Sequence, residues 1–433
     1  MRHVVIVGGG FAGLKAAKVL GKSKDVKVTL IDKSNHHLFQ PLLYQVATSG
    51  LSESDIAVPI RSILSRFKNI YILQETVDNI DFNNQKITTN FSELSYDYLI
   101  LCCGAKHAYF GHDEWEPFAP GLKTLEQAVE IRRRILTAFE EAERQTDVSK
   151  RKKNLTFAVV GGGPTGVELA GAIGEMSRFA LSKDFRNIDP KLTRVVLIEA
   201  GPRILSSFPE ALSSIATRDL ENLGVQVWTS SMVTKVSDKG VEIGNERIDA
   251  GTVIWAAGIK APELNYKIGF ELDKQGRIII EKDLSVPGFS NAFVAGDQAS
   301  FSHQTGSPLP CLSPVAIQQG ECIAKNILND IKGKKRKDFS YFDKGQMATI
   351  GKSRAIVEIG RLTISGFPAW LTWLFVHIYF ITGFNNRIMI FIKWMISYMT
   401  NKKGARIIYN QDWEFYTHKC RIVDQSIHQM KKP

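Results

Sequence analysis

Cysteine is scarce in this chain of 433 residues. The five cysteines are odd in number and include no Cys-x-x-Cys pair, although Cys102 and Cys103 are adjacent. This pattern excludes a thioredoxin-type redox pair and argues against a framework of disulfides. We therefore expect a protein of a reducing compartment.

Long hydrophobic runs are also missing. The most aromatic stretch, Pro368 to Thr400, is interrupted by Asn385-Asn386-Arg387, so it lacks the run of about 20 apolar residues that a spanning helix needs. Its aromatic residues stand near Lys393 and Arg406, a composition typical of helices that lie in a membrane interface. Two ordinary core helices are the alternative.

The chain leaves little room for a targeting peptide, because the strand-like Val4-Val5-Ile6-Val7 follows Met1 almost at once. We therefore expect the body of the protein to face the cytoplasm. Together with interfacial helices, this predicts a monotopic protein on the cytoplasmic face of the inner membrane.

Acidic residues are few in the last quarter of the chain. After residue 331, 18 Lys and Arg face 6 Asp and Glu, which gives this part +12, whereas the whole chain carries +11. The first 331 residues are therefore almost neutral. A basic segment on a neutral body favours an anionic surface, either membrane lipid or nucleic acid.

Glycine, in contrast, is clustered in two loops that each follow a strand and open a helix. The first is Gly8-x-Gly10-x-x-Gly13, and Asp32 ends the next expected strand 19 residues later. The first glycine permits a tight turn, the second lets the backbone approach a pyrophosphate, and the third lets helix and strand pack closely. A carboxylate at Asp32 would accept a hydrogen bond from a ribose, so this unit predicts dinucleotide binding.

The second loop, Gly161-x-Gly163-x-x-Gly166, has the same flanks, and its acid is Glu199, 33 residues after Gly166. The polar stretch from Ser182 to Thr193 accounts for the longer spacing. Glu199 would accept from a 2′-hydroxyl and repel a 2′-phosphate, which favours NADH over NADPH.

Apolar runs rich in Val and Ile alternate with amphipathic stretches throughout the first three quarters, which indicates the α/β class with parallel sheets. We expect a helix over 127 to 146, domain crossings at Thr146 to Asn154 and near 260 to 290, and a strand at Asn291 to Ala295 that returns to the first sheet. This predicts two Rossmann-type domains, with the second (150 to 265) inserted in the first (1 to 125 and 270 to 330). A charged linker, Lys332 to Lys337, would then lead to a third region at 335 to 433.

Two dinucleotide folds in this order resemble the two-dinucleotide-binding flavoprotein superfamily. Tyr96 to Gly104 is similar to its strand that ends near the flavin, Thr252 to Gly258 to the counterpart in the nicotinamide domain, and Val294-Ala295-Gly296-Asp297 to its late FAD motif. The resemblance implies non-covalent FAD on the first fold and NADH on the second. It assigns FAD to Gly8, Gly10, Gly13, Asp32, Gly104 and Asp297, and NADH to Gly161, Gly163, Gly166, Glu199 and Gly258.

The segment Asn35 to Thr48 resembles the loop that follows the first fold in type II NADH dehydrogenases, the non-pumping NADH:quinone oxidoreductases. The similarity extends over essentially the whole chain and places Thr48 beside the flavin. It implies hydride transfer from NADH to FAD, and then transfer of two electrons to a membrane quinone in a respiratory chain, without a metal. It also implies a homodimer, in which the third region anchors the membrane and joins the subunits, and makes lipid rather than nucleic acid the expected partner.

The same resemblance gives roles to a few polar residues. Glu168 stands in the first turn of the second domain's helix, where it would either complement the helix dipole or, as the family implies, lie near both redox rings and assist proton movement. Ser313 to Gly320 is similar to the quinone-site motif Ala-Gln-x-Ala-x-Gln, with Gln318 at its last glutamine and Pro314 where the first is usual. Gln318, Gln319 and His377 are the expected quinone residues, although a helix start and a structural histidine are the plainer interpretations.

Two other functions remain open at this point. A sulfide:quinone oxidoreductase resembles this architecture but needs paired redox cysteines, and Cys102 and Cys103 look structural because they end a buried strand. A non-enzymatic NADH-binding signalling flavoprotein would instead use the basic tail on nucleic acid.

Overall fold

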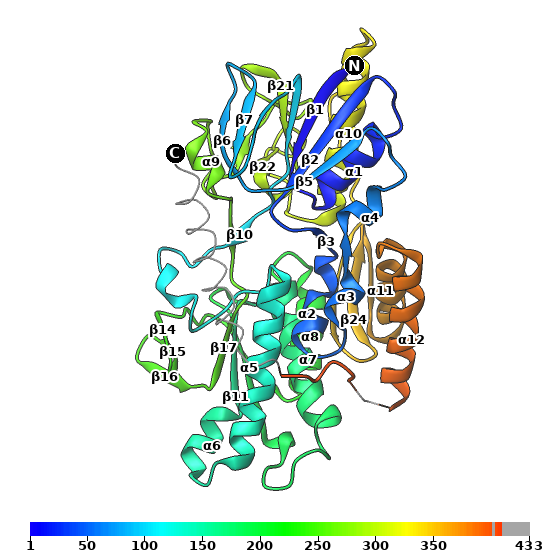
Figure 1. The fold of residues 1–433 in the computed structure, drawn as a ribbon. Helices are drawn as coiled ribbons and strands as arrows, with labels where there is room; N and C mark the ends of the chain where they lie inside the picture. The colour runs from blue at the N-terminus through cyan, green and yellow to red at the C-terminus, as the bar shows by residue number, and fades with distance from the viewer. Residues whose placement is uncertain (401–402, 409–433) are drawn as a thin grey trace, which may run out of the picture.

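The computed structural model describes residues 1–400 and 403–408 (Figure 1). One part of it, called the first body below, is built on a six-stranded sheet. The strand order is β20-β21-β9-β1-β2-β5, and all neighbours are parallel except β20 and β21. Strands from the start of the chain therefore share a sheet with strands near residue 290. Their bounds are β1 Arg2–Val7, β2 Val26–Asp32, β5 Ile70–Gln74, β9 Tyr98–Leu101, β20 Ser285–Val286 and β21 Phe289–Val294.

Two helices cross this sheet beside the first glycine loop. Helix α1 (Phe11–Leu20) starts at the loop, and α10 (Ser313–Ile331) packs against it. The two helices approach so closely that a Cβ on Gly320 would lie 2.2 Å from the backbone oxygen of Ala12. Gly320, the last residue of the predicted quinone motif, is thus needed for packing.

A second parallel sheet, in the order β13-β12-β11-β17, is the centre of another part of the structure, called the second body below. Its strands are buried nearly throughout, as expected for a sheet with helices on its faces. The strands are β11 Thr156–Val160, β12 Arg194–Ile198, β13 Val225–Trp228 and β17 Thr252–Trp255, and the helices are α5 Leu125–Arg144, α7 Pro164–Glu175 and α8 Glu210–Asn222.

The chain crosses between the bodies at a short antiparallel ribbon of β10 (Lys106–His107) and β18 (Ile259–Lys260) (Figure 1). The predicted crossing at Thr146 to Asn154 is wrong, because Val148–Asn154 forms helix α6 next to α5 in the second body. Asp147 caps that helix by accepting from Ser149 and Lys150, a polar pattern that resembles a loop in sequence. The second crossing, predicted near 260 to 290, has β18 at its start.

Small antiparallel elements extend both bodies. The first carries β6 Val77–Asp81, β7 Lys86–Thr89 and β8 Glu93–Ser95, and the second carries β14 Lys235–Ser237, β15 Gly240–Ile243 and β16 Glu246–Asp249. Between the first loop and β5 lie β3 His36–Leu38, α2 Leu43–Ala47, α3 Glu53–Ile56, β4 Ala57–Pro59 and α4 Ile60–Leu64.

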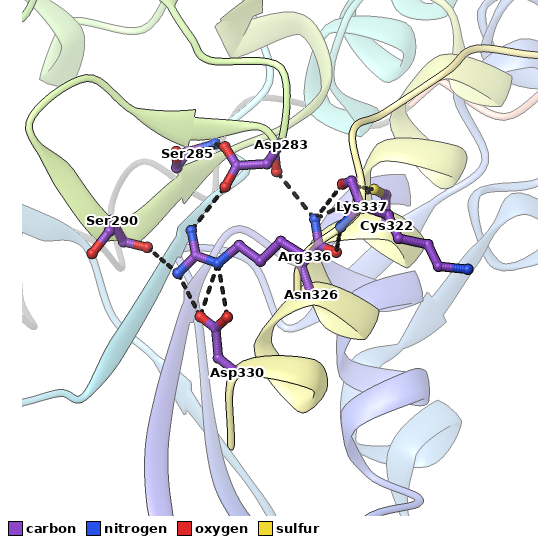
Figure 2. Close-up of polar contacts among 8 residues, drawn as sticks. All are labelled: Asp283, Ser285, Ser290, Cys322, Asn326, Asp330, Arg336 and Lys337. Atoms are coloured by element: carbon purple, nitrogen blue, oxygen red, sulfur yellow. Dashed lines mark hydrogen bonds and ion pairs between the residues drawn. The ribbon is translucent and has the colours of Figure 1, made fainter. Parts of the chain in front are cut away.

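The segment predicted as a free charged linker is fastened to the first body (Figure 2). Arg336 makes ion pairs with Asp330 and Asp283 and donates to the Ser290 backbone oxygen at 2.6 Å. Asn326 exchanges two hydrogen bonds of 2.9 Å with the backbone of Lys337. These contacts at Arg336 and Lys337 therefore hold the start of the C-terminal region against the first body.

The C-terminal region adds a three-stranded antiparallel sheet and two helices. The strands are β23 Gln346–Gly351, β24 Arg354–Ile359 and β25 Leu362–Ser365, followed by α11 Gly366–Phe380 and α12 Phe384–Thr400. β23 packs on α7, and α11 packs on β24. One hydrophobic core thus joins this region to the second body and to the segment around α2.

Helices α11 and α12 leave many apolar side chains in contact with solvent. In residues 1–400 and 403–408, no helix combines the length and hydrophobicity needed to cross a bilayer. The exposed side chains include Phe375, Tyr379, Phe380, Ile388, Met389, Phe391, Ile392, Met395, Ile396, Tyr398 and Met399. So many exposed apolar side chains on two neighbouring helices favour an interaction site over a solvated face.

Candidate functional site

The two glycine loops occupy equivalent positions, at the carboxyl ends of β1 and β11. Gly8 and Gly161 have φ of +107° and +110°, a region open to glycine but not to side chains. A Cβ on Gly8 would lie 2.2 Å from the Cys102 oxygen, and one on Gly161 would lie 2.6 Å from the Ala256 carbonyl carbon. The first glycine of each loop is therefore required both by conformation and by contact.

The other glycines of each loop have distinct surroundings. A Cβ on Gly13 would lie 1.9 Å from the Gly8 oxygen, and one on Gly166 would lie 1.8 Å from the Gly161 oxygen, so both positions serve helix packing. Gly10 and Gly163 face open space and act as N-caps without a side-chain hydrogen bond. A pyrophosphate could accept hydrogen bonds from the uncapped N–H groups at these helix ends, because open space lies beside Gly10 and Gly163.

Each loop is tied to its acid in the same way. Asp32 accepts from Gly9 N at 2.5 Å and from Ser34 N at 2.7 Å. Glu199 accepts from Gly162 N and Gly201 N, both at 2.6 Å. Because a carboxylate has about four acceptor positions, each acid keeps capacity for a ribose while its orientation is fixed.

The remaining residues assigned to FAD lie around the end of the first sheet. Gly104, with φ of +70°, follows β9, and Thr48 is buried, with its hydroxyl donating to the Tyr44 oxygen at 2.9 Å. Asp297 forms an ion pair of 2.9 Å with Lys123, and both side chains are mostly buried. No local pattern indicates Lys123, because it stands 174 positions from Asp297 in the chain.

Glu168 lies in α7, partly buried between α2 and β23. Burial raises its pKa to about 8, and a hydrogen bond with the Thr349 backbone opposes this shift. The neighbouring Tyr44 hydroxyl accepts from Gln45 at 2.9 Å, and burial and the Glu168 charge raise its pKa well above the usual value. Glu168 thus keeps its proton at neutral pH, as a group that delivers protons requires.

The predicted quinone glutamines are both engaged with the backbone. Gln318 donates to the Phe342 oxygen at 2.9 Å and accepts from Phe342 N at 3.0 Å. Gln319 is buried and accepts from Gly296 N at 2.7 Å, next to Asp297. Pro314 lies in the first turn of α10, where a missing N–H carries no penalty.

His377 lies in α11 and contacts the segment after the first loop. Its Nδ1 is 2.7 Å from the Trp373 oxygen, its ring centroid is 6.3 Å from that of Phe39, and burial lowers its pKa to about 4. The ring is therefore neutral at physiological pH.

Helix α12 is fastened to α2 and α3 by polar contacts that the sequence did not indicate. Lys393 Nζ is 2.7 Å from both carboxylate oxygens of the buried Asp55. Trp394 Nε1 donates to Gln45 Oε1 at 2.7 Å, and Gln45 in turn donates to Tyr44. Hydrogen bonds thus connect Trp394 of α12, through Gln45, to Tyr44, which lies beside Glu168.

The adjacent cysteines Cys102 and Cys103 directly follow β9. Cys102 and Cys103 are free thiols, and burial raises the pKa of Cys102 well above its usual range and that of Cys103 to about 12. Thiols that stay protonated are poor nucleophiles, so these residues do not favour sulfide chemistry.

Comparison with known proteins agrees with this geometry. Residues 2–320 match the family model for pyridine nucleotide-disulphide oxidoreductases. Two type II NADH:quinone oxidoreductases of Mycobacterium tuberculosis are 44% and 40% identical to this chain; each alignment covers 95% of it and 90% and 91% of the relatives, respectively.

Solved structures share the fold. The NDH2 protein of Plasmodium falciparum in complex with NADH superposes with a TM-score of 0.85 at 20% identity, covering 94% of this chain and 100% of that one. The sulfide:quinone oxidoreductase of Aquifex aeolicus gives 0.71 at 21% identity, covering 92% and 95%. The sequence relatives, more similar and nearly full-length, identify the chain as a member of the type II NADH:quinone oxidoreductase family.

Proposed function

We propose that this protein oxidises NADH and passes two electrons to a membrane quinone without pumping protons. The observation that carries the proposal is the duplicated loop, in which two glycine turns, two uncapped helices and two oriented acids are built alike. Two dinucleotides side by side are what an enzyme needs to move a hydride between cofactors.

FAD fits the first loop, where Gly10 leaves space for the pyrophosphate and Asp32 faces the ribose position. Thr48, Gly104 and Asp297 would hold the remainder, with Lys123 fixing the Asp297 carboxylate. When bound, the flavin supplies the chemistry that accepts a hydride and releases electrons singly or in pairs. NADH is assigned to the second loop, in a domain inserted between the two halves of the first.

The protein's own contribution to quinone reduction is the supply of protons and the placement of the acceptor. Glu168 holds a proton on its carboxyl group at neutral pH and can release it to a reduced quinone oxygen. Gln318 and Gln319 fix the backbone at Phe342 and Gly296. Neutral His377 contributes from α11, where its ring lies near Phe39. We assign the quinone site to these residues.

The exposed apolar face of α11 and α12 is the proposed contact with the bilayer, on the cytoplasmic face of the inner membrane. A quinone dissolved in lipid would reach the protein from this side, and the basic C-terminal region would attract anionic headgroups. We also propose that the region from 335 to 433 joins two subunits as a homodimer.

An anaerobic stopped-flow experiment tests the central proposal. Protein loaded with FAD is mixed first with NADH and then with a soluble quinone, while flavin absorbance is followed. We expect bleaching by NADH without sulfide, and recovery on adding quinone. Failure to bleach, or bleaching that only sulfide produces, would contradict the proposal.

A vesicle experiment tests the electron acceptor separately. NADH oxidation is measured with liposomes that contain or lack a long-chain quinone. The quinone-containing liposomes should support turnover, whereas no turnover with either, together with binding of the protein to DNA, would favour a signalling flavoprotein.

A further inference from the structure

Phe110 combines exposure with an unfavourable backbone conformation. Its side chain is 70% exposed, and its φ is +53°, followed by φ of +93° at Gly111. A bulky L-residue is rarely found in the left-handed region. Such strain persists only where the surroundings hold it, and it concentrates at ligand sites.

The Phe110 ring lies over the end of β17. Its Cζ is 2.6 Å from the position that a Cβ on Gly258 would take, and its centroid is 6.5 Å from that of Trp255. The backbone beside it is tied to the same strand, since Trp255 Nε1 donates to the Ala108 oxygen at 2.9 Å and Ala108 N donates to the Gly258 oxygen at 3.4 Å. The backbone at Ala108, two residues before the ring, is thus tied to both Trp255 and Gly258.

The strand order determines which half of a bound dinucleotide lies beside Gly258. Glu199 directly follows β12, the glycine loop follows β11, and Gly258 follows β17, which lies on the other side of β11. A dinucleotide with its adenosine ribose at Glu199 and its pyrophosphate on the loop extends its other half across β17. The loop and this segment touch, because a Cβ on Gly161 would lie 2.7 Å from Ala257 N.

We propose that Phe110 is a substrate-positioning residue whose exposed ring covers the nicotinamide half of bound NADH beside Gly258. This inference rests on the proposed function, because it needs NADH on the second loop. Contact with the dinucleotide removes both an exposed aromatic face and a flat ring of the ligand from water. The ring therefore contributes to binding of the nicotinamide half and not of the adenosine half.

Two ligands that bind without turnover distinguish contact with the nicotinamide half of NADH from contact with the adenosine half. Tetrahydro-NADH, which does not transfer a hydride, carries both halves, whereas ADP-ribose lacks nicotinamide. In the FAD-loaded enzyme, Phe110→Ala should raise the Kd of tetrahydro-NADH about tenfold and leave that of ADP-ribose within about twofold. Phe110→Tyr should restore the wild-type values, and the KM for NADH should follow the Kd of tetrahydro-NADH.

Control variants distinguish positioning from a structural role. Phe91→Ala removes an aromatic ring that is 81% exposed on the β7–β8 hairpin and should change neither Kd. Phe110→Gly relieves the positive φ, so its melting temperature should not fall below that of the wild type, yet it should bind tetrahydro-NADH as weakly as Phe110→Ala. The inference is overturned if both Kd values stay unchanged in Phe110→Ala or rise by the same factor. Because the titrations need no turnover, their outcome is independent of whether the wild-type protein oxidises NADH.

Discussion

At the scale of single residues, Glu168 couples the proposed chemistry to stability. Its pKa in the folded protein is about 8, whereas the unfolded chain titrates near 4.5. Between these values the folded state holds a proton that the unfolded state releases. The free energy of unfolding therefore falls as pH rises through this window.

Replacing Glu168 by Gln removes this penalty and should stabilise the protein increasingly from pH 5 to pH 8. Because the residue is partly buried, we expect a gain of about 2–4 °C in melting temperature at pH 8 and little at pH 5. Thermal melts of both proteins at pH 5, 6.5 and 8 check this. A gap that does not grow with pH would show that Glu168 ionises normally.

The matched control is Glu246→Gln, which alters an exposed carboxylate on β16 and should give no pH-dependent gap. Activity separates the two consequences of Glu168→Gln: quinone turnover should fall while FAD stays bound, because the amide has no proton to deliver.

A pair of glutamines allows the quinone role of Gln318 to be separated from its backbone contacts. Gln304 makes the same two bonds to Tyr341, at 3.0 Å and 2.8 Å, that Gln318 makes to Phe342. Substituting either residue by Leu should lower stability by about 1–2 kcal/mol. Only Gln318→Leu should also raise the KM for quinone, as measured in steady-state assays with a soluble quinone. Equal effects of the two variants on that KM would leave Gln318 with a structural role alone.

Residues close in sequence were predictable, and partners far apart were not. The glycine loops and their acids follow from spacing, because strand, turn and helix are consecutive in the chain. The contacts Lys123 to Asp297 and Lys393 to Asp55 join residues 174 and 338 positions apart, and no local pattern carries that information. The helix at Val148–Asn154 was missed for the opposite reason, since its polar residues resemble a loop.

At the scale of elements, α12 depends on a partly buried ion pair. Asp55 is 8% exposed and Lys393 36%, and Asp55 also accepts from Ser52 N at 2.7 Å. Truncating the lysine would leave a buried carboxylate without its cation, which is far more costly than losing a surface pair.

Lys393→Met should therefore lower the free energy of unfolding by about 1–3 kcal/mol, measured by denaturant titration. The control, Lys325→Met, breaks an exposed pair with Glu321 and should change it by less than about 0.5 kcal/mol. If Lys393→Met lowered the free energy of unfolding as little as Lys325→Met, the ion pair between α12 and α3 would add nothing measurable to stability.

At the scale of the whole molecule, basic charge and exposed apolar side chains both belong to the last quarter of the chain. The region after residue 331 carries +12 on a nearly neutral body, and the exposed side chains of α11 and α12 lie in the same region. Attraction to anionic lipid is screened over about 8–10 Å at physiological salt, whereas burial of apolar surface is not screened. The two contributions can therefore be separated by salt.

Electrostatic attraction and burial of apolar surface should both strengthen binding to vesicles. With anionic vesicles, raising salt from about 50 to 500 mM should weaken binding about tenfold or more, because each headgroup contact by Lys or Arg is worth about 1 kcal/mol at low salt. With neutral vesicles, binding should be weaker and almost independent of salt, since only the apolar face contributes. Co-sedimentation over a salt series measures both. If salt abolished binding to anionic vesicles and neutral vesicles bound nothing, the apolar face of α11 and α12 would have no part in the membrane contact.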